Sequence, residues 1–394
     1  MSTDHVAAKP ASRFQFGAVS AVFSAFLIDG AGFGAWAALL PVFKSQLSIS
    51  EGQLSVALFS MVIGSVAAMP IAGRFIARLG SRRVIIAAAV AYSILLPLVA
   101  LTASPASTLA IFAIGALITG AAKGSLDVSV NAQAIAIENH EGRPIVARCH
   151  GGWSMGALTG SLFVAGGLKL SLGAPLIMTL LGLLLLGLAA FSGRRLTEHD
   201  RPDEHAHHRH SLWPRGRLAP LAALAFIALF CEGSMADWSA VFLADVVGAE
   251  PASAALGFAT YATAMTASRF CGDQLSHRLG PVVLMRFSGA VAALGLALSL
   301  ASQTYWLGLL GFAMAGFGLA NIIPALFRAA ARHGHAGPAI ASVSTVGYVG
   351  LLIGPPIIGA LSRTLGLPLS LGLLVLFSGV LGASANLAKP RGTN

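Results

Sequence analysis

Long apolar stretches recur along nearly the whole chain of 394 residues, and short polar breaks separate them. A helix that crosses a bilayer needs roughly 20 mostly apolar residues, and each stretch meets that length. The pattern predicts an all-α membrane protein with twelve transmembrane helices. They cover residues 17–43, 53–77, 83–103, 107–137, 145–168, 174–192, 218–245, 253–277, 281–301, 304–331, 337–361 and 367–388.

Polar segments divide these helices into two sets. An N-terminal tail, 1–16, precedes a six-helix bundle at 17–192, and a second six-helix bundle covers 218–388. A linker, 193–217, joins the bundles, and 389–394 forms a C-terminal tail. Because no small-residue cleavage site follows the first apolar stretch, we expect it to be a retained helix and not a signal peptide.

Charge sets the expected orientation. Charged residues make up 10% of the chain, against about 25% in soluble proteins. The net charge of +10 would suggest nucleic-acid binding only if the basic residues clustered on one solvated face, but these residues are spread among loops. With both termini and the linker in the cytoplasm, all but four of the 25 Lys and Arg lie on that side, as the positive-inside rule requires. We therefore expect a location in the bacterial inner (plasma) membrane. The four exceptions are Lys44, Lys123, Lys169 and Arg363.

Several chemistries have no signature in the sequence. The three cysteines are odd in number and lack metal-ligand spacing, so we expect no disulfide framework. Neither a phosphate-binding Gly-x4-Gly-Lys-Ser/Thr loop nor a Gly-x-Ser-x-Gly elbow is present. We expect no enzyme, no cofactor and no metal ligand in the helices. The linker is either a metal-binding tract or a solvated tether, since it holds His199, His205, His207, His208 and His210.

Motifs recur between the two halves at an offset of 194 to 203 residues. Parallel repeats of this kind are typical of secondary transporters. The glycines of the fifth and eleventh predicted helices, such as Gly152, Gly156, Gly160, Gly350 and Gly354, have small-xxx-small spacing, which predicts close helix packing. The matched sets are Asp29-Gly30 and Trp36 with Glu232-Gly233 and Trp238, Gly115 and Gly120 with Gly311 and Gly316, Gly156 and Gly160 with Gly350 and Gly354, and Arg78-Leu79-Gly80 with Arg278-Leu279-Gly280.

The loop at 73–83, Gly-Arg-Phe-Ile-Ala-Arg-Leu-Gly-Ser-Arg-Arg, resembles the signature loop between helices 2 and 3 of the major facilitator superfamily. The resemblance covers essentially the whole chain and implies that family's fold of two pseudo-symmetric six-helix halves. One position departs, because Ala77 replaces the family's acid and His277 stands at the matching place in the second half; Asp273 is a candidate substitute there. Positive charge in short cytoplasmic loops sets orientation and can bond helix C-termini, so we expect Arg74, Arg78, Arg82, Arg83 and Arg278 to serve topology and the cytoplasmic gate. His150, at the cytoplasmic start of its helix, either belongs to the gate, makes a loop hydrogen bond or carries a proton.

Two further segments, 127–131 and 148–156, resemble the fucose-permease-like group of proton-linked sugar symporters. The pattern at 232–238 is similar to an uncharacterised bacterial branch of inner-membrane permeases. In the sugar permeases the helix 4 acid is functional, and the resemblance carries that role to Asp127. Their helix 1 acid does not carry over, since the matching position is Ala37 and Asp29 lies about two turns away.

Five ionisable residues fall at mid-helix, where each costs roughly 2.5 to 3.5 kcal/mol and so marks a functional site. They are Asp29, Lys123, Asp127, Glu232 and Asp237. We expect proton coupling at Asp127, Lys123, Asp29 and Glu232. Lys123, Asp127 and Asn131 share one helix face, which either lines a cavity or holds a self-neutralising Lys123–Asp127 pair.

The expected substrate site combines acids, amides and rings. Glu232 and Asp237 lie about 140° apart around one helix, so we expect one to face the cavity and the other to contact a neighbouring helix. Asn321 either binds substrate or links helices. Three buried tryptophans either stack on a sugar or only pack. The remaining substrate candidates are Asn131, Trp36, Trp153 and Trp238.

The leading functional hypothesis is a proton-coupled symporter for a small polar solute such as a sugar. The alternatives are an exporter or antiporter of a metabolite or drug, and a sensor that transports nothing. Against drug export, Ser161 follows Gly160 where drug antiporters of the family have Gly-Pro. The expected partners are a small-molecule substrate, protons and the lipid bilayer, with no nucleic acid, and we expect a monomer.

Overall fold

The computed structural model describes residues 13–141, 145–196, 214–302, 304–332 and 336–389, and within them all regular structure is helical. The histidines of the expected linker lie outside these residues. Ten of the described segments are long and apolar enough to span a membrane. The helices are α1 (Arg13–Leu47), α2 (Glu51–Leu79), α3 (Ser81–Thr102), α4 (Leu109–Glu141), α5 (Val146–Lys169), α6 (Ala174–Gly193), α7 (Leu218–Asp245), α8 (Pro251–Ala254), α9 (Leu256–Ala301), α10 (Tyr305–Leu319), α11 (Ile322–Ala330), α12 (Ala336–Leu365), α13 (Leu367–Ala383) and the 3-10 helix η1 (Ser384–Ala388).

The predicted break between the helices 253–277 and 281–301 is confirmed, because Gly280, with φ of 73°, is non-helical and separates two helices that together carry the label α9. The predicted helix 304–331 differs from the structure, because it is divided into α10 and α11 next to Asn321, whose φ is −100° and ψ −2°. Apolar content continues through this second break, so hydropathy alone does not locate it.

Turn positions repeat between the two parts of the chain. Gly80, between α2 and α3, has φ of 82°, and Gly280 in α9 has φ of 73°. Ser48 and Ser171, with φ of 51° and 58°, are matched about 200 residues later by Gly248 and Gly366. A positive φ costs little for glycine and more for other residues. The same backbone turns therefore occur in both halves even where the residue differs.

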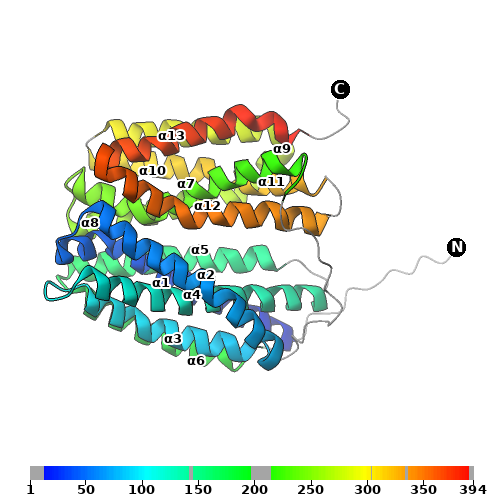
Figure 1. Ribbon diagram of the computed structural model, residues 1–394. Coiled ribbons are helices and arrows are strands. Elements are labelled where there is room, and N and C mark those ends of the chain that lie inside the picture. The colour runs from blue at the N-terminus through cyan, green and yellow to red at the C-terminus, as the bar shows by residue number, and fades with distance from the viewer. Residues whose placement is uncertain (1–12, 142–144, 197–213, 303, 333–335, 390–394) are drawn as a thin grey trace.

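The helices run side by side and form an elongated bundle, with α1 to α6 in the lower part of Figure 1 and α7 to α13 in the upper part. Helices α1 and α5 touch closely, and so do α7 and α12. A Cβ atom at Gly156 or Gly160 would overlap the backbone of α1, and one at Gly350 would overlap the backbone of α7. The predicted close packing at these glycines is confirmed.

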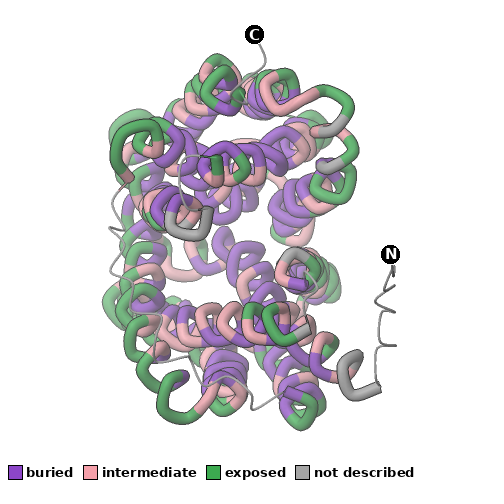
Figure 2. Tube along the Cα trace, turned by 90° about the vertical axis from the view of Figure 1, so that its right-hand side faces the viewer, coloured by how far each residue is buried: buried purple, intermediate pink, exposed green. Residues whose placement is uncertain are grey.

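Exposed residues lie along the outside of the bundle, and buried residues lie toward its interior (Figure 2). Many of the exposed side chains are large and apolar, such as Leu183, Leu294 and Leu376. Water would not favour such a surface, but lipid tails do. The outer surface thus fits a protein that spans a bilayer several times.

Candidate functional site

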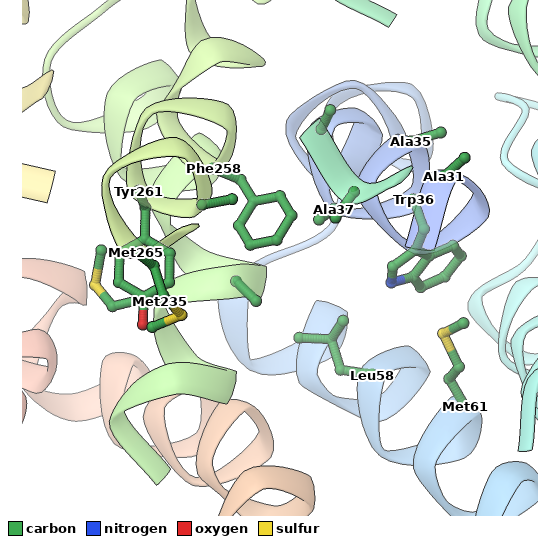
Figure 3. Packing of buried hydrophobic residues seen from close by; sticks show 14 of the residues in the cluster. Ala31, Ala35, Trp36, Ala37, Leu58, Met61, Met235, Phe258, Tyr261 and Met265 are labelled. Atoms are coloured by element: carbon green, nitrogen blue, oxygen red, sulfur yellow. The ribbon is translucent and has the colours of Figure 1, made fainter. Parts of the chain in front are cut away.

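A cavity of about 180 Å³ lies where the two sets of helices face each other. Side chains from α1, α2, α4 and α5 line one side, and side chains from α7, α9 and α12 line the other. Figure 3 shows Trp36, Leu58 and Met61 facing Tyr261 and Met265 across this space. Most of the lining is aromatic or aliphatic. The charged exceptions are Lys123, Glu232, Asp237 and Arg269.

On the first side, a charged cluster joins three helices. Asp29 of α1 is fully buried, and its Oδ2 accepts a hydrogen bond of 2.9 Å from Trp153 Nε1 of α5. Its Oδ1 lies 3.3 Å from Lys123 Nζ of α4, and that ammonium is 5.6 Å from the centre of the Phe33 ring. The long lysine side chain reaches from the cavity wall to a carboxylate behind it.

Glycines allow Asp29 to sit this close to α5. A Cβ atom at Gly30 would overlap the carbonyl oxygen of Trp153, and one at Gly34 would overlap that of Ala157. With no side chain at either position, the two backbones approach until the Trp153 indole reaches Asp29. Gly30, which follows Asp29 in the repeated motif, therefore permits the close approach of α1 and α5.

Of the two alternatives for Lys123, Asp127 and Asn131, the Lys123–Asp127 pair is not formed. Lys123 makes its ion pair with Asp29, although Asp127 also acts on it electrostatically. The Asp127 carboxylate accepts a hydrogen bond of 3.2 Å from Asn131 Nδ2. Helical spacing placed all three residues on one face, but the reach of lysine to another helix decided its partner. Neither Asp127 nor Asn131 lines the cavity.

On the second side, the expectation that only one acid of α7 faces the cavity is wrong. Glu232 and Asp237 both line it. The two residues are five positions apart, which is roughly 7.5 Å along the helix axis, so a cavity that extends over this length of α7 contacts both side chains. Glu232 Oε1 lies 3.5 Å from Arg269 Nη2 of α9. Asp237 is 9% exposed, and its Oδ1 has no hydrogen-bond partner.

Arg269 lies in the cavity wall, although the predicted orientation counted it among the cytoplasmic basic residues. It lies eight residues before the predicted end of its helix, roughly 12 Å along the axis, and it lines the cavity. Counting that distance could have identified it as a sixth mid-helix charge. Phe258, Tyr261 and Met265 of the same helix were missed because aromatic and thioether side chains also occur throughout lipid-facing surfaces.

The three tryptophans lie in different environments. Trp36 and Trp153 line the cavity, and the Trp36 ring also stacks on Phe112 with centroids 5.7 Å apart. Trp238 is fully buried outside the lining, and its Nε1 donates to the carbonyl oxygen of Pro355 at 2.9 Å. Its contacts support the packing alternative.

Asn321 also supports the structural alternative. The residue is 5% exposed at the break between α10 and α11. Its Nδ2 donates to Ser268 Oγ of α9 at 2.9 Å. The amide thus links two helices where one of them is interrupted, and it is not among the residues that line the cavity.

The candidate gate residues lie away from the cavity. Arg74, Arg78, Arg83 and Arg278 are exposed, whereas Arg82 donates from Nε to the carbonyl oxygen of Gly193 at 3.2 Å, at the end of α6. His150 of α5 packs edge-on against Phe26, with ring centroids 5.1 Å apart. The side chains of Asp273 and His277 lie outside the described part of the structure.

At the opposite end of the bundle, a lysine joins the two sets of helices. Lys44 Nζ, at the end of α1, lies 2.8 Å from Glu51 of α2 and 2.6 Å from Asp245 of α7. Arg363 of α12 packs against Gly52 of α2 next to it. Among the described residues, the Lys44–Asp245 contact is the ion pair that connects the two sets, so this end is held closed.

Comparison with known proteins agrees with the fold. A family model described as Major Facilitator Superfamily matches residues 21–355. An uncharacterised MFS-type transporter of Yersinia pestis is 35% identical over 365 residues, 92% of this chain and 93% of that protein.

Two solved structures have the same arrangement of helices. A bacterial homologue of the human lysosomal transporter Spinster, in an inward-facing and unoccupied conformation, gives a TM-score of 0.75 at 14% identity, covering 96% of this chain and 98% of that one. A D-xylose–proton symporter gives 0.73 at 13% identity, covering 94% and 97%. At such identities they are evidence for the fold alone.

Proposed function

This chain belongs to the major facilitator superfamily, a family of multi-pass membrane transporters, and on that premise we propose that it carries a small polar solute across the bacterial inner membrane by proton-coupled symport. The observation that carries the proposal is the cavity between the two sets of helices, with a lysine in its wall that interacts with two acids. A solute in this cavity contacts both sets of helices at once.

Transport proceeds by alternating access. The bundles at 17–192 and 218–388 rock around the cavity, as parallel repeats do in this class of transporter. The contact of Lys44 with Asp245 closes one end of the cavity in the present state. Opening that end requires this ion pair to break. The opposite end, which holds the arginines of 73–83, then closes. With both termini cytoplasmic, the present state is closed toward the periplasm.

Proton coupling uses the lysine between Asp29 and Asp127. Lys123 neutralises the buried Asp29 carboxylate, which is also held by Trp153. When solute entry or helix movement draws Lys123 toward Asp127, Asp29 would remain as an unpaired buried charge, and binding a proton removes that charge. Return of Lys123 releases the proton. Glu232, paired with Arg269, is the corresponding acid in the second half.

The dimensions of the cavity favour a small solute. Its volume of about 180 Å³ equals that of roughly six water molecules at about 30 Å³ each. Trp153 is partly exposed in the cavity wall and offers a ring face on which the C–H face of a sugar packs, while the charged groups bind hydroxyls.

The test uses full-length protein in proteoliposomes. A thermal-shift screen first identifies a solute, because a ligand of the folded state raises apparent stability. Uptake is then driven by an imposed inward proton gradient, and we expect accumulation in the wild type and only equilibration, with exchange intact, in Asp29→Asn. The matched control, Glu250→Gln, removes an exposed carboxylate and should behave as the wild type.

Other outcomes reassign the roles. Accumulation by Asp29→Asn with its loss in Asp127→Asn would make Asp127 the coupling carboxyl. Movement of solute against the proton flow would show that the protein is an exporter or antiporter. Binding without flux in either direction would show a sensor.

A further inference from the structure

The cavity wall holds buried polar atoms that lack a hydrogen-bond partner. They are Asp237 Oδ1, Glu232 Oε1 and Tyr261 Oη. An ionised carboxylate only accepts hydrogen bonds, and a tyrosine hydroxyl can accept as well as donate. A buried acceptor without a donor carries a cost of about 1 to 3 kcal/mol, and more if it is charged. The Arg269 guanidinium lies 3.5 Å from Glu232 Oε1, and the tyrosine hydroxyl can also donate, so among these three atoms Asp237 Oδ1 is the acceptor that no donor or cation approaches.

The charged side chains of the cavity wall also leave Asp237 without a partner. Two basic and two acidic side chains line the cavity, and each basic side chain is already paired with an acidic one. Lys123 lies 3.3 Å from Asp29, which is outside the lining, and Arg269 lies 3.5 Å from Glu232. Asp237 remains as the one lining charge without an opposite charge beside it. No described hydrogen bond or ion pair satisfies its carboxylate.

A group that satisfies this site must supply hydrogen-bond donors and positive charge together. A hydroxyl supplies one donor and no charge, whereas an ammonium group supplies three donors, a positive charge and no acceptor. Ring faces also attract cations, and Trp36, Phe258 and Tyr261 line the same cavity. An ammonium beside Asp237 would thus find both a counter-ion and aromatic neighbours.

We propose that the transported solute is a small organic amine, and that Asp237 is the residue that binds its ammonium group. This inference rests on the proposed transport function and narrows its substrate class. The cavity of about 180 Å³ lies below the roughly 300–1,000 Å³ of drug-sized sites, so a compact amine fits and a long amphipathic cation does not.

The experiment compares amines with hydroxyl compounds of the same shape. Purified full-length protein in detergent is titrated with cyclohexylamine and cyclohexanol, tyramine and tyrosol, and glucosamine and glucose, with binding followed by calorimetry. We expect at least one amine to bind the wild type and its hydroxyl counterpart to bind roughly 10- to 100-fold more weakly, as the loss of a charged hydrogen bond implies. The difference should vanish in Asp237→Asn, persist in Asp237→Glu, and be unchanged in the control Glu250→Gln.

Equal binding of amine and hydroxyl partners by the wild type would overturn the proposal, and that comparison needs no variant to fold. So would amine affinity that is unchanged in Asp237→Asn, or binding of no amine in the panel. An uncharged solute that is transported equally by wild type and Asp237→Asn would refute this inference and leave the transport function standing. An amine that binds through Asp237 without being transported would support the assignment of Asp237 as the ammonium-binding residue and refute the transport function.

Discussion

Replacing Lys123 with methionine tests the charged cluster at the first side of the cavity. The change keeps most of the side-chain volume and removes the cation from Asp29, whose side chain is fully buried. The Lys123 side chain is itself only 16% exposed, so the pair is not a surface contact that water screens. Breaking such a buried pair costs about 3 to 5 kcal/mol, because an uncompensated charge remains.

Replacing the partner residue, Asp29, should lower the free energy of unfolding by a smaller amount. Asp29→Asn leaves Lys123 with Asp127 as an electrostatic neighbour and keeps a side chain that can accept from Trp153. We expect the free energy of unfolding to fall by about 1.5 to 3 kcal/mol, the range for a hydrogen bond with one charged partner. The double variant Asp29→Asn/Lys123→Met leaves no unpaired charge and should lower it by about as much as Asp29→Asn alone. The interaction energy from the double-mutant cycle then equals the cost of Lys123→Met, about 3 to 5 kcal/mol.

The chain provides its own reporter for this measurement. Cys149 and Cys231 are buried and Cys271 is exposed, and all three are free. In a Cys271→Ser background, a thiol-reactive fluorescent dye labels the protein only as it unfolds, and the four members of the cycle can be compared by denaturant titration in one detergent. If the cost of the double variant equals the sum of the two single costs, Lys123 and Asp29 do not act as a pair.

Three further variants probe other parts of the structure. Lys44→Met removes the ion pair with Asp245, so spin labels at Ser48 and Ala249 should report a larger share of long distances than in the wild type; an unchanged distribution would contradict a closing role. Gly30→Ala places a methyl group on the Trp153 carbonyl and should destabilise the fold by about 1 to 3 kcal/mol, whereas the control Gly73→Ala, with open space around it, should change stability by less than about 1 kcal/mol. Arg78→Ala should slow transport more than it weakens solute binding, and equal losses would place Arg78 in the binding site.

The helices were predictable because the bilayer imposes one requirement on every segment. Each spanning segment must be apolar, and a window of hydropathy detects this. The break at Gly280 follows polar residues and was predictable in the same way. Asn321 interrupts a helix inside apolar surroundings and donates a hydrogen bond to Ser268. This interruption depends on a neighbouring helix and leaves no signal in hydropathy.

Most charged residues of the site were predictable from the sequence, but the ion pairs and hydrogen bonds that they form were less so. Asp29, Lys123, Glu232 and Asp237 were identified because charges are rare inside membranes. Their partners depended on the reach of side chains across helices, which helical spacing does not describe. Spacing offered Lys123 as one possible partner of Asp127, yet the Asp127 carboxylate accepts a hydrogen bond from Asn131.

The repeat explains why backbone and chemistry differ in predictability. Matched turns such as Gly80 and Gly280 show that both halves keep one backbone path. The matched acids Asp29 and Glu232, however, find their bases on non-equivalent helices, Lys123 on α4 and Arg269 in the first part of α9. The backbone path is constrained by helix packing throughout each half, whereas a cavity side chain is constrained only by its neighbours and by the solute. A difference in charge between two halves of similar backbone therefore reflects the solute, and Asp237, which lines the cavity without an ion-pair partner among the described residues, is one such difference.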